Sequence, residues 1–421
     1  MNIGFLGLGK LGLPVALATE SKGHKVFGYD ISEKTINNIK NRIIDYREIW
    51  VEDYLPKTNL EILNIEQLVS KSDIIFIPIQ TPHDEKYEGV TRIPSERSDF
   101  DYTYLIRGVK NLSDEIEKQK QDKVVIIIST VLPGTITRDI KPLLGNHTKL
   151  VYNPFFIAMG STMKDFLHPE FVLFGRDDDK ALKIGKEFYK TISNAPIYDT
   201  TIENAELIKV AYNTLISTKI SFANTLMEMC YHLPNTDVDE VTNALKMANN
   251  RLISGAYMSG GMGDGGGCHP RDNIAMSYLS KKFNISHNWF ENIMVQREKQ
   301  TEWMADIIIE KSNGMQVNIL GKTFKAETNL TLGSPAILLK NLLEEKGIKV
   351  NQWDPYVDGD YVKYKKLYEW NTKPQTFFIA TKHDFFTKIK FLKESLVIDP
   401  WRFIPSTNND YKLLQIGKNT I

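Results

Sequence analysis

The sequence predicts an α/β protein in which two parallel-sheet domains flank a helical segment. Apolar runs of strand length alternate with amphipathic helical patterns near both ends of the chain, which is typical of βαβ units. Between them, residues 201–231 contain no proline or glycine and keep apolar residues at helical spacing, so we expect one long helix there. The length of 421 residues fits two or three domains of roughly 100–200 residues each.

The first domain is expected over residues 1–197. Several of its strand segments are continuously apolar, as in a parallel sheet that helices cover on both faces. The expected strands are Ile3–Leu6, Lys25–Tyr29, Asp73–Ile79, Val124–Ile128, Lys149–Tyr152 and Phe171–Phe174.

A central helical segment is expected over residues 198–312, and a smaller Rossmann-like α/β domain over residues 313–421. The central segment starts with the long helix and contains a glycine-rich loop at Gly260–Gly267. In the smaller domain the helical pattern Pro335–Lys346 is followed by Gly347, a residue type favoured just after helix ends. The strands expected in this domain are Val317–Leu320, Ile348–Trp353, Thr376–Ile379 and Leu396–Ile398.

Composition and charge argue against several classes of function. The 52 basic and 52 acidic residues cancel, so the chain lacks the positive field that nucleic-acid binding requires, and we expect no nucleic-acid partner. Only Cys230 and Cys268 are present, which is typical of a reducing compartment. No signal peptide and no run of 18 apolar residues is evident. We therefore expect a soluble cytoplasmic protein without a membrane partner.

A glycine-rich turn follows the first predicted strand. Residues 7–12 read Gly7-Leu8-Gly9-Lys10-Leu11-Gly12, which fits G-x-G-x-x-G, and a helical pattern follows at Leu13–Ser21. The first glycine permits a tight turn, the second lets a pyrophosphate approach the backbone, and the third lets helix and strand pack closely. Asp30 ends the second strand, where a carboxylate binds the ribose 2′-hydroxyl and repels a 2′-phosphate. The first domain is therefore predicted to be a Rossmann domain that binds NAD rather than NADP.

A second glycine run precedes Cys268, the candidate nucleophile. The segment Gly263-Asp264-Gly265-Gly266-Gly267 comes directly before this cysteine, and His269-Pro270-Arg271-Asp272 directly after it. Glycines let a substrate approach the backbone, and a nearby arginine or helix N-terminus favours the reactive thiolate. The alternative is an inert buried thiol, which is our expectation for Cys230 on the long helix.

The long helix carries three polar residues whose spacing places them on one face. Glu206, Lys209 and Asn213 are related as i, i+3 and i+7. A cation beside an amide can hold a developing oxyanion, so Lys209 and Asn213 are candidate catalytic residues. The alternative is a solvent-facing stripe with a Glu–Lys pair.

Together, the NAD-binding pattern, the cysteine loop and the Lys-x-x-x-Asn helix resemble the nucleotide-sugar dehydrogenases, the UDP-glucose 6-dehydrogenase family. The resemblance covers nearly the whole chain in the same order. It includes Gly7–Gly12, Asp30, Thr81-Pro82, Ser129–Thr135, Asn153-Pro154, Glu206–Asn213, Arg251, Gly265–Cys268, Asp272, Phe324-Lys325 and Asp354-Pro355.

The resemblance implies a four-electron oxidation of a UDP-sugar with NAD as cofactor. The carbon-6 alcohol loses a hydride, Cys268 adds to the aldehyde, and loss of a second hydride leaves a thioester that water hydrolyses. It implies that Cys268, Lys209, Asn213 and Asp272 are catalytic. It implies that the cofactor contacts Gly7, Leu8, Gly9, Lys10, Leu11, Gly12, Asp30, Thr81, Pro82, Ser129, Thr130 and Val131.

The resemblance also implies the substrate contacts and a partner. The implied substrate-binding residues are Phe155, Phe156, Met159, Lys209, Asn213, Arg251, Gly263, Gly265, Phe324 and Lys325. Arg251 would reach the substrate of a second copy across a dimer interface, so we expect a homodimer or a higher homo-oligomer. No metal site is expected.

The chain departs from the family pattern at the segment after Asn153-Pro154. Phe155 and Met159 stand where the family has glutamates, the first of which is thought to serve proton transfer during thioester hydrolysis. Candidate substitutes are Asp272, Asp264 and Asp165. Arg271 replaces a usual lysine, Asp264 a usual aromatic residue, an arginine normally found before Ser334-Pro335 is missing, and Arg251 lies one residue further from Cys268 than expected.

Three functions therefore stay open at the level of sequence. The leading one is an NAD-dependent nucleotide-sugar 6-dehydrogenase, with UDP-glucose as the default substrate and a UDP-N-acetylhexosamine as the alternative. The second is a nucleotide-sugar-binding protein without catalysis. The third is a two-electron dehydrogenase of the 6-phosphogluconate or 3-hydroxyacid kind, which needs no cysteine.

Overall fold

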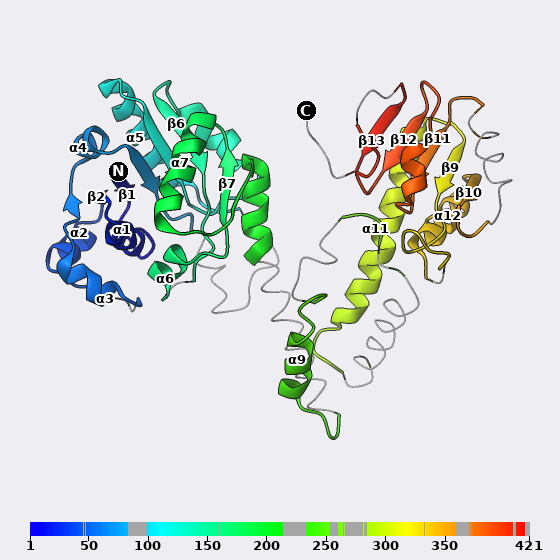
Figure 1. The fold of residues 1–421 in the computed structure, drawn as a ribbon, viewed down its shortest axis with the longest axis horizontal. Coiled ribbons are helices and arrows are strands. Elements are labelled where there is room, and N and C mark those ends of the chain that lie inside the picture. Colours follow the sequence, from blue (N-terminus) through cyan, green and yellow to red (C-terminus); the bar gives the residue numbers. More distant parts are fainter. Residues whose placement is uncertain are drawn as a thin grey trace. The chain divides into compact units, whose positions relative to one another are not determined.

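The computed structural model divides into two compact units, Met1–Thr218 and Lys219–Ile421 (Figure 1). Within them the structure describes residues 1–44, 46, 48–82, 99–158, 160–213, 233–252, 260–263, 265, 281, 284–331, 333–358, 370, 372–406 and 410–416.

The first unit is built on an eight-stranded sheet with the order β3-β2-β1-β4-β5-β6-β7-β8. All six predicted strands are present, and two further strands, β3 and β8, were not predicted. Both lack a continuous apolar run and lie at the sheet edges, so their sequences carry little strand signal. The bounds are β1 Asn2–Leu6, β2 Lys25–Tyr29, β3 Glu61–Ile62, β4 Ile74–Ile77, β5 Lys123–Ile127, β6 Thr148–Tyr152, β7 Val172–Arg176 and β8 Ile197–Thr201.

The sheet is parallel from β3 to β6. β7 pairs with β6 in the antiparallel direction, and β8 runs parallel to β7. The sequence predicted that the strands of this sheet all run parallel, and the direction of β7 and β8 differs from that prediction. In the link from β6 to β7, residues 153–171, the described helix is the short α6, Thr162–Leu167. β7 therefore starts at the edge of the sheet where β6 ends, which gives antiparallel pairing. The reversal keeps Phe155 and its neighbours at the edge where ligands bind in such sheets.

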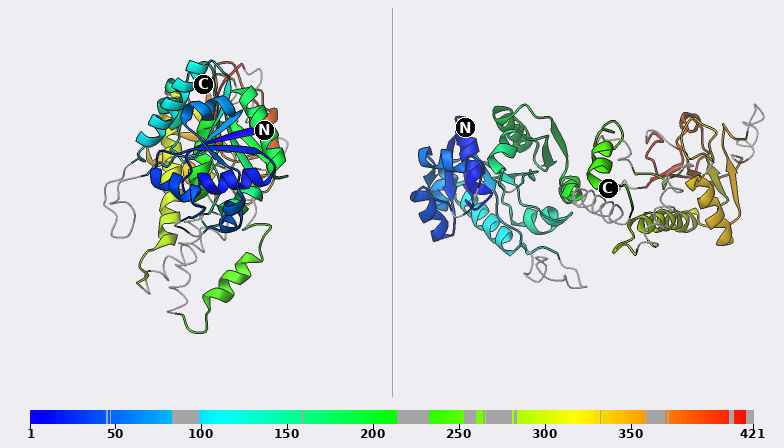
Figure 2. Two further views of the ribbon diagram at one scale, coloured as in Figure 1. Left: turned by 90° about the vertical axis from the view of Figure 1, so that its left-hand side faces the viewer. Right: turned by 90° about the horizontal axis from the view of Figure 1, so that it is seen from below.

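Helices lie on both sides of this sheet (Figures 1 and 2). One apolar core joins the strands to α1 (Gly12–Ser21), α2 (Glu33–Lys40), α3 (Val51–Tyr54), α6 and α7 (Asp179–Ile192). The other joins them to α4 (Ile65–Lys71), α5 (Thr103–Gln119), the π-helical turn η3 (Ile136–Ile140) and a helix that begins at residue 202. Two short turns, η1 (Leu55–Lys57) and η4 (Lys141–Leu143), complete the described helical elements of this unit.

Local sequence explains where several of these helices begin. Ser32 caps α2 by accepting a hydrogen bond from the backbone of Thr35, and Asp178 caps α7 in the same way. Asn64 and Gln67 form a reciprocal capping box at α4. Such caps satisfy backbone N–H groups that the first helical turn leaves without partners.

The second unit contains a five-stranded parallel sheet with the order β10-β9-β11-β12-β13. The four predicted strands are present; β13 was missed because its sequence Lys-Leu-Leu-Gln has no long apolar run. The strands are β9 Val317–Leu320, β10 Val350–Trp353, β11 Thr376–Ile379, β12 Leu396–Asp399 and β13 Lys412–Gln415, and the helices are α9 Val238–Lys246, α11 Trp289–Ser312, α12 Pro335–Glu345 and η5 Asp384–Lys388.

Two predicted helical features are seen in the described part of the chain. Helix α12 starts after the cap Ser334, has Pro335 in its first turn, and is followed by Gly347 with a φ of 78°, as the sequence predicted. The predicted long helix over 201–231 is helical from residue 202 to 213; residues 214–232 lie outside the described residues. The domain limits at 197/198 and 312/313 stay predictions.

Candidate active site

The glycine turn after β1 has the geometry of a phosphate-binding turn. Gly7 has a φ of 121°, and its N–H donates to Tyr29 O at 2.8 Å. A Cβ on Gly12 would lie 2.2 Å from Gly7 O, whereas a Cβ on Gly9 would meet nothing within 4 Å. Leu11, at the N-terminus of α1, provides no side-chain cap. The turn is thus closed by packing at Gly12 and open at Gly9, with helix N–H groups available for an anion.

Asp30 holds this turn from the end of β2. One carboxylate oxygen accepts a hydrogen bond from Leu8 N at 2.7 Å, and the other accepts one from Ser32 N at 2.8 Å. A carboxylate oxygen has a second lone pair, so each can still accept a ribose hydroxyl. The side chain of Leu8 is buried behind the turn, so a cofactor could contact only the backbone of this residue.

A cavity of about 820 Å³ opens beside this turn, where β2 and β4 lie on opposite sides of β1. This reversal of strand order is the place where α/β sheets bind nucleotides. Ten residues predicted from the sequence line the cavity: Gly7, Gly9, Lys10, Leu11, Asp30, Thr81, Ser129, Thr130, Phe155 and Lys209.

One wall of the cavity, formed by α5, was not predicted from the sequence. Tyr104, Arg107 and Asn111 of α5 line the cavity, and their i, i+3, i+7 spacing puts them on one helix face. Leu105, Val109 and Leu112 are buried on the opposite face. The amphipathic pattern of α5 was therefore a usable signal, but nothing local to the helix shows that its polar face meets a cavity.

The charges around the cavity suit a dinucleotide. The described lining residues include the cations Lys10, Arg107 and Lys209 and a single carboxylate, that of Asp30. The pyrophosphate of NAD carries two negative charges, which this excess of cations attracts. The open turn, the carboxylate of Asp30 and the charge balance all fit NAD.

The loops after β4 and β5 are tied to each other at the cavity. Thr81 Oγ1 donates to Thr130 O at 2.6 Å, and Ser129 Oγ donates to Ile79 O at 2.5 Å. Tyr152 OH donates to Ser129 O at 3.1 Å from behind. Of the remaining predicted cofactor residues, Val131 is fully buried, and Pro82 accepts from Asp101 N through its carbonyl. Both shape the wall without lining it.

Lys209 reaches the cavity from the helix that begins at residue 202. It is 7% exposed, and its Nζ donates to Asn213 Oδ1 at 3.4 Å. The ammonium lies 5.3 Å from the centre of the Phe156 ring. Burial lowers the pKa of Lys209. The structure thus brings the predicted Lys209–Asn213 pair together.

Glu206, on the same helix, does not form the alternative Glu–Lys pair. Its carboxylate accepts hydrogen bonds from Gly134 N at 2.5 Å and Ile136 N at 2.8 Å. The spacing in the sequence showed that Glu206 and Lys209 are neighbours on the helix. It could not show that the backbone at Gly134 and Ile136 would donate hydrogen bonds to the Glu206 carboxylate.

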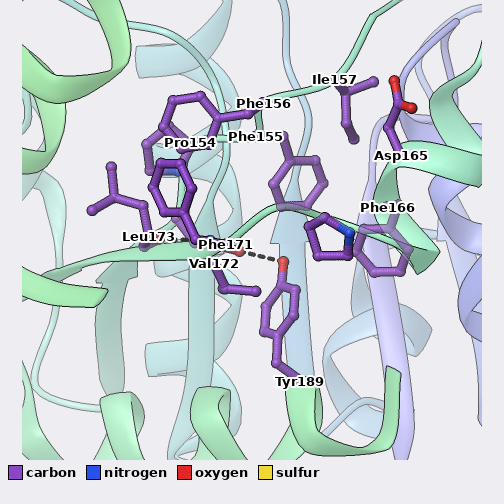
Figure 3. Close-up of a pocket in the computed structure, with 12 residues that line it drawn as sticks. Pro154, Phe155, Phe156, Ile157, Asp165, Phe166, Phe171, Val172, Leu173 and Tyr189 are labelled. Atoms are coloured by element: carbon purple, nitrogen blue, oxygen red, sulfur yellow. Dashed lines mark hydrogen bonds between the residues drawn. The ribbon is translucent and has the colours of Figure 1, made fainter. Parts of the chain in front are cut away.

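An aromatic cluster surrounds a small pocket (Figure 3), and one of its rings, that of Phe156, lies beside Lys209. Phe155 lines the cavity and packs on Phe166 with ring centres 5.5 Å apart. Phe156 turns the other way, toward Phe171 and Tyr212, each at 4.6 Å. Behind them is a second cavity of about 20 Å³, which is the size of a single water molecule. The wall beside Lys209 is therefore apolar.

Asp165 is the one of the three candidate substitutes for the family glutamates that lies within the described residues. Asp165 Oδ2 accepts hydrogen bonds from Ala158 N at 3.0 Å and Ser161 Oγ at 2.8 Å, so this carboxylate organises the loop after Phe155. Asp264 and Asp272, the other two candidates, lie outside the described residues, as do Met159 and Cys268.

In the second unit, a turn after β9 carries Phe324 and Lys325. Gly321 has a φ of 112°, and its N–H donates to Trp353 O at 2.8 Å. Asp354, at the end of β10, accepts from Lys322 N at 2.7 Å and, through its other oxygen, from Tyr356 N at 2.8 Å. These bonds hold the turn in a fixed shape.

The two lysines of this turn have different surroundings. Lys322 pairs with Asp358 at 2.5 Å, whereas the side chain of Lys325 is exposed. Lys325 is therefore the cation of the turn that a ligand can reach.

The glycine loop before Cys268 packs against this turn within the second unit. A Cβ on Gly265 would lie 2.8 Å from both Phe324 Cβ and Pro335 Cδ, so a side chain there would push the two segments apart. Gln300 and Arg402 hold the loop by donating to Gly261 O at 3.1 Å and Gly260 O at 2.6 Å. Gly263 follows in the same loop, and Arg251 lies after α9 with an exposed side chain.

Comparison with known proteins covers nearly the whole chain. Residues 1–193, 203–296 and 318–406 match the NAD binding domain, the central domain and the UDP binding domain of the UDP-glucose/GDP-mannose dehydrogenase family. The chain belongs to this family. Its members carry out NAD-dependent two-step oxidation of nucleotide sugars, and the resemblance, the α/β fold class and the NAD cofactor predicted from the sequence are confirmed.

Named relatives in this family act on different nucleotide sugars. The chain is 28% identical over 367 residues to the UDP-glucose 6-dehydrogenase TuaD of Bacillus subtilis, covering 84% of this chain and 76% of that protein. It is 26% identical over 371 residues to the GDP-mannose 6-dehydrogenase of Pseudomonas aeruginosa, covering 85% and 82%. A crystal structure of a ternary complex of GDP-mannose dehydrogenase from Pseudomonas aeruginosa has the same fold, with a TM-score of 0.87 at 24% identity over 98% of this chain and 99% of that one.

Among the residues that the structure describes, no group of three or more His, Cys, Asp or Glu side chains could hold a metal ion. In the same residues, no helix is both long and apolar enough to cross a bilayer.

Proposed function

We propose that this protein oxidises the carbon-6 alcohol of a UDP-sugar to the uronic acid in two NAD-dependent steps through Cys268. The observation that carries the proposal is the Lys209–Asn213 pair, because Lys209 lines the same cavity as the dinucleotide turn. UDP-glucose is the default substrate, and a UDP-N-acetylhexosamine remains the alternative.

Lys209 and Asn213 are assigned to the oxygen on carbon 6. Bound NAD supplies the hydride acceptor. The Lys209 ammonium and the Asn213 amide can both donate hydrogen bonds to an oxygen whose negative charge grows during the reaction, and the apolar wall at Phe155 and Phe156 strengthens this interaction by excluding water. Because burial lowers the pKa of Lys209, its amine exchanges protons more readily near neutral pH than an exposed lysine does.

Cys268 is assigned the covalent steps. Its thiolate adds to the carbon-6 aldehyde, and the oxygen takes up a proton to give a thiohemiacetal. The second hydride then passes from carbon 6 to a second NAD while the oxygen releases its proton, which leaves a thioester. Water attacks the thioester and releases the acid and the thiol. Asp272 is assigned to proton transfer near that water. A soft sulfur nucleophile suits both steps, since the adduct can lose hydride and the product can be hydrolysed.

The second unit is assigned to the sugar nucleotide. The exposed side chain of Lys325 is assigned to the diphosphate, and Phe324 is assigned to an apolar contact with the same ligand. Gly263, Gly265 and Arg251 complete the proposed contacts, the last from a second copy in a homodimer or higher homo-oligomer. We assign the enzyme to the cytoplasm, where reducing conditions keep Cys268 as a thiol.

Incubation with NAD and a panel of UDP-sugars tests the proposal, with NADH followed by absorbance. Two NADH per uronate are expected, and Cys268→Ser should lose the second oxidation while it keeps NAD binding. A covalent adduct on Cys268, detected by mass spectrometry of the intact protein, would identify the nucleophile and the substrate mass together. Absence of NADH with every sugar of the panel contradicts the proposal.

A nucleotide-sugar-binding role without turnover is the second candidate. It is favoured by the cavity wall, where Phe155 replaces a glutamate and Asp30 is the single carboxylate among the described lining residues. Calorimetry would then show UDP-sugar binding that Cys268→Ser leaves unchanged, with no NADH formed.

A further inference from the structure

Glu206 is a fully buried carboxylate one helical turn before Lys209. It is 0% exposed, and burial raises its pKa, while the N–H groups of Ile136 and Gly134 oppose this rise. Burying a carboxylate is costly unless hydrogen bonds compensate for the lost water. Its two backbone hydrogen bonds, to Gly134 N and Ile136 N, supply that compensation and fix both oxygens in place.

The segment that Glu206 holds continues into the wall of the cofactor cavity. Ser129 and Thr130 line the cavity, and the chain then turns through Gly134, which has a φ of 89°, into η3. Tyr102 OH accepts from Leu132 N at 3.1 Å. With the bonds that Thr130 O and Ser129 O accept from Thr81 and Tyr152, the turn at residues 129–136 is anchored along its whole length.

The carboxylate therefore joins two parts of the site. On one side it binds the turn whose first residues face the cofactor. On the other side it belongs to the helix that presents Lys209, three residues later and about 4.5 Å further along the helix axis. Any movement of Glu206 relative to Gly134 changes the distance between the cofactor wall and the lysine.

We infer that Glu206 is a positioning residue, whose two backbone hydrogen bonds set the position of Lys209 relative to the NAD-binding wall at Ser129 and Thr130. The inference rests on the proposed role of Lys209. Displacements of about 1 Å in catalytic groups cost on the order of 100-fold in rate, which is a reason to hold a lysine against a fixed backbone turn.

Glu206→Gln is the test variant. Glutamine keeps the size of the side chain but offers one acceptor oxygen, and its amide N–H groups would face a backbone donor. Glu203→Gln is a matched control, because Glu203 lies on the same helix, is exposed, and accepts from Thr137 Oγ1 of the same η3 segment at 2.6 Å. Two measurements need no sugar: the Kd for NAD by calorimetry, and the rate at which an amine-reactive reagent labels Lys209, read by mass spectrometry against exposed lysines.

The expected result is a Kd for NAD about tenfold higher in Glu206→Gln, equal to about 1.4 kcal/mol, together with faster labelling of Lys209. Glu203→Gln should change neither. Glu206→Asp keeps the charge but has a shorter side chain, so its Kd for NAD and its Lys209 labelling rate should lie between those of the native protein and Glu206→Gln. The same variant replaces Glu206→Gln in the test if Glu206→Gln does not fold.

Two outcomes overturn the inference. One is a folded Glu206 variant with unchanged NAD affinity and unchanged Lys209 labelling. The other is an equal change in Glu203→Gln, which would mean that any loss on this helix has the same effect. If Glu206→Gln behaves as expected but the native protein oxidises no UDP-sugar, the proposed function fails and the positioning role stands.

Discussion

Two glycines of the same turn are predicted to respond in opposite ways to the same substitution. At Gly12 an added Cβ would lie 2.2 Å from Gly7 O and 2.9 Å from Pro78 Cγ. To reach ordinary contact, the helix and the turn would have to separate by about 1.2 Å, an overpacking that costs roughly 1–3 kcal/mol. Gly12→Ala should therefore lower both the stability of the first unit and its affinity for NAD.

Gly9→Ala should leave the protein intact and damage only the binding site. A Cβ there meets no atom within 4 Å, and Gly9 is not among the glycines with positive φ. Replacing glycine by alanine at such a position stabilises a protein by about 0.4–1 kcal/mol through the unfolded state. The methyl group would, however, occupy the space through which the pyrophosphate approaches the backbone.

Thermal unfolding and calorimetry with NAD separate the two effects. For a unit of this size 1 kcal/mol corresponds to about 2–4 °C in Tm, so Gly12→Ala should melt roughly 4–8 °C earlier for a cost of about 2 kcal/mol. Gly9→Ala should melt at or above the native temperature yet bind NAD at least about tenfold more weakly, or about 1.4 kcal/mol. Native NAD affinity in Gly9→Ala, or equal loss of stability in both variants, would refute the reasoning.

Three further predictions concern single side chains. Arg107→Ala should weaken NAD binding a few-fold and reduce its salt dependence, because one cavity cation is lost; calorimetry at two ionic strengths checks this. Lys209→Met should lower NADH formation by about 100-fold or more while the protein still binds NAD. Burial lowers the pKa of His24 below 6.5, so the unfolded state binds more protons and stability should fall as the pH drops through 6.5; melting curves at pH 7.5 and 5.5 should show a smaller fall in His24→Gln.

The parts of the fold that depend on local sequence pattern could be predicted. Strands such as β4 and β5 are buried on both faces and read as unbroken apolar runs, so their positions followed from the sequence. The antiparallel direction of β7 did not follow, because it depends on a link that stays at one edge of the sheet. β13 was missed because an edge strand needs apolar residues on fewer positions.

The site was predictable where its parts are local and not where distant segments meet. The glycine turn and Asp30 are recognised by their spacing, and Lys209 and Asn213 by a single helical turn. Arg107 was missed because a polar face on α5 looks like a solvated surface until the sheet brings it to a cavity. The partner of Glu206 could not be predicted for the same reason, because Gly134 is 72 residues away in the chain.

The turns at Gly7 and Gly321 share one design although their sequences differ. In each turn a glycine with a positive φ follows its strand, and its N–H donates to the carbonyl of the last residue of the neighbouring strand. The next residue along that neighbouring strand is an aspartate, Asp30 or Asp354. Its carboxylate accepts a hydrogen bond from the backbone N–H of the residue after the glycine and another from the backbone N–H two residues after the aspartate. The two later glycines of the first turn have no counterpart in Gly321-Lys322-Thr323-Phe324-Lys325. The aspartate at this corner therefore supports the turn whether or not two further glycines follow, and its backbone hydrogen bonds are a structural feature of both sheets.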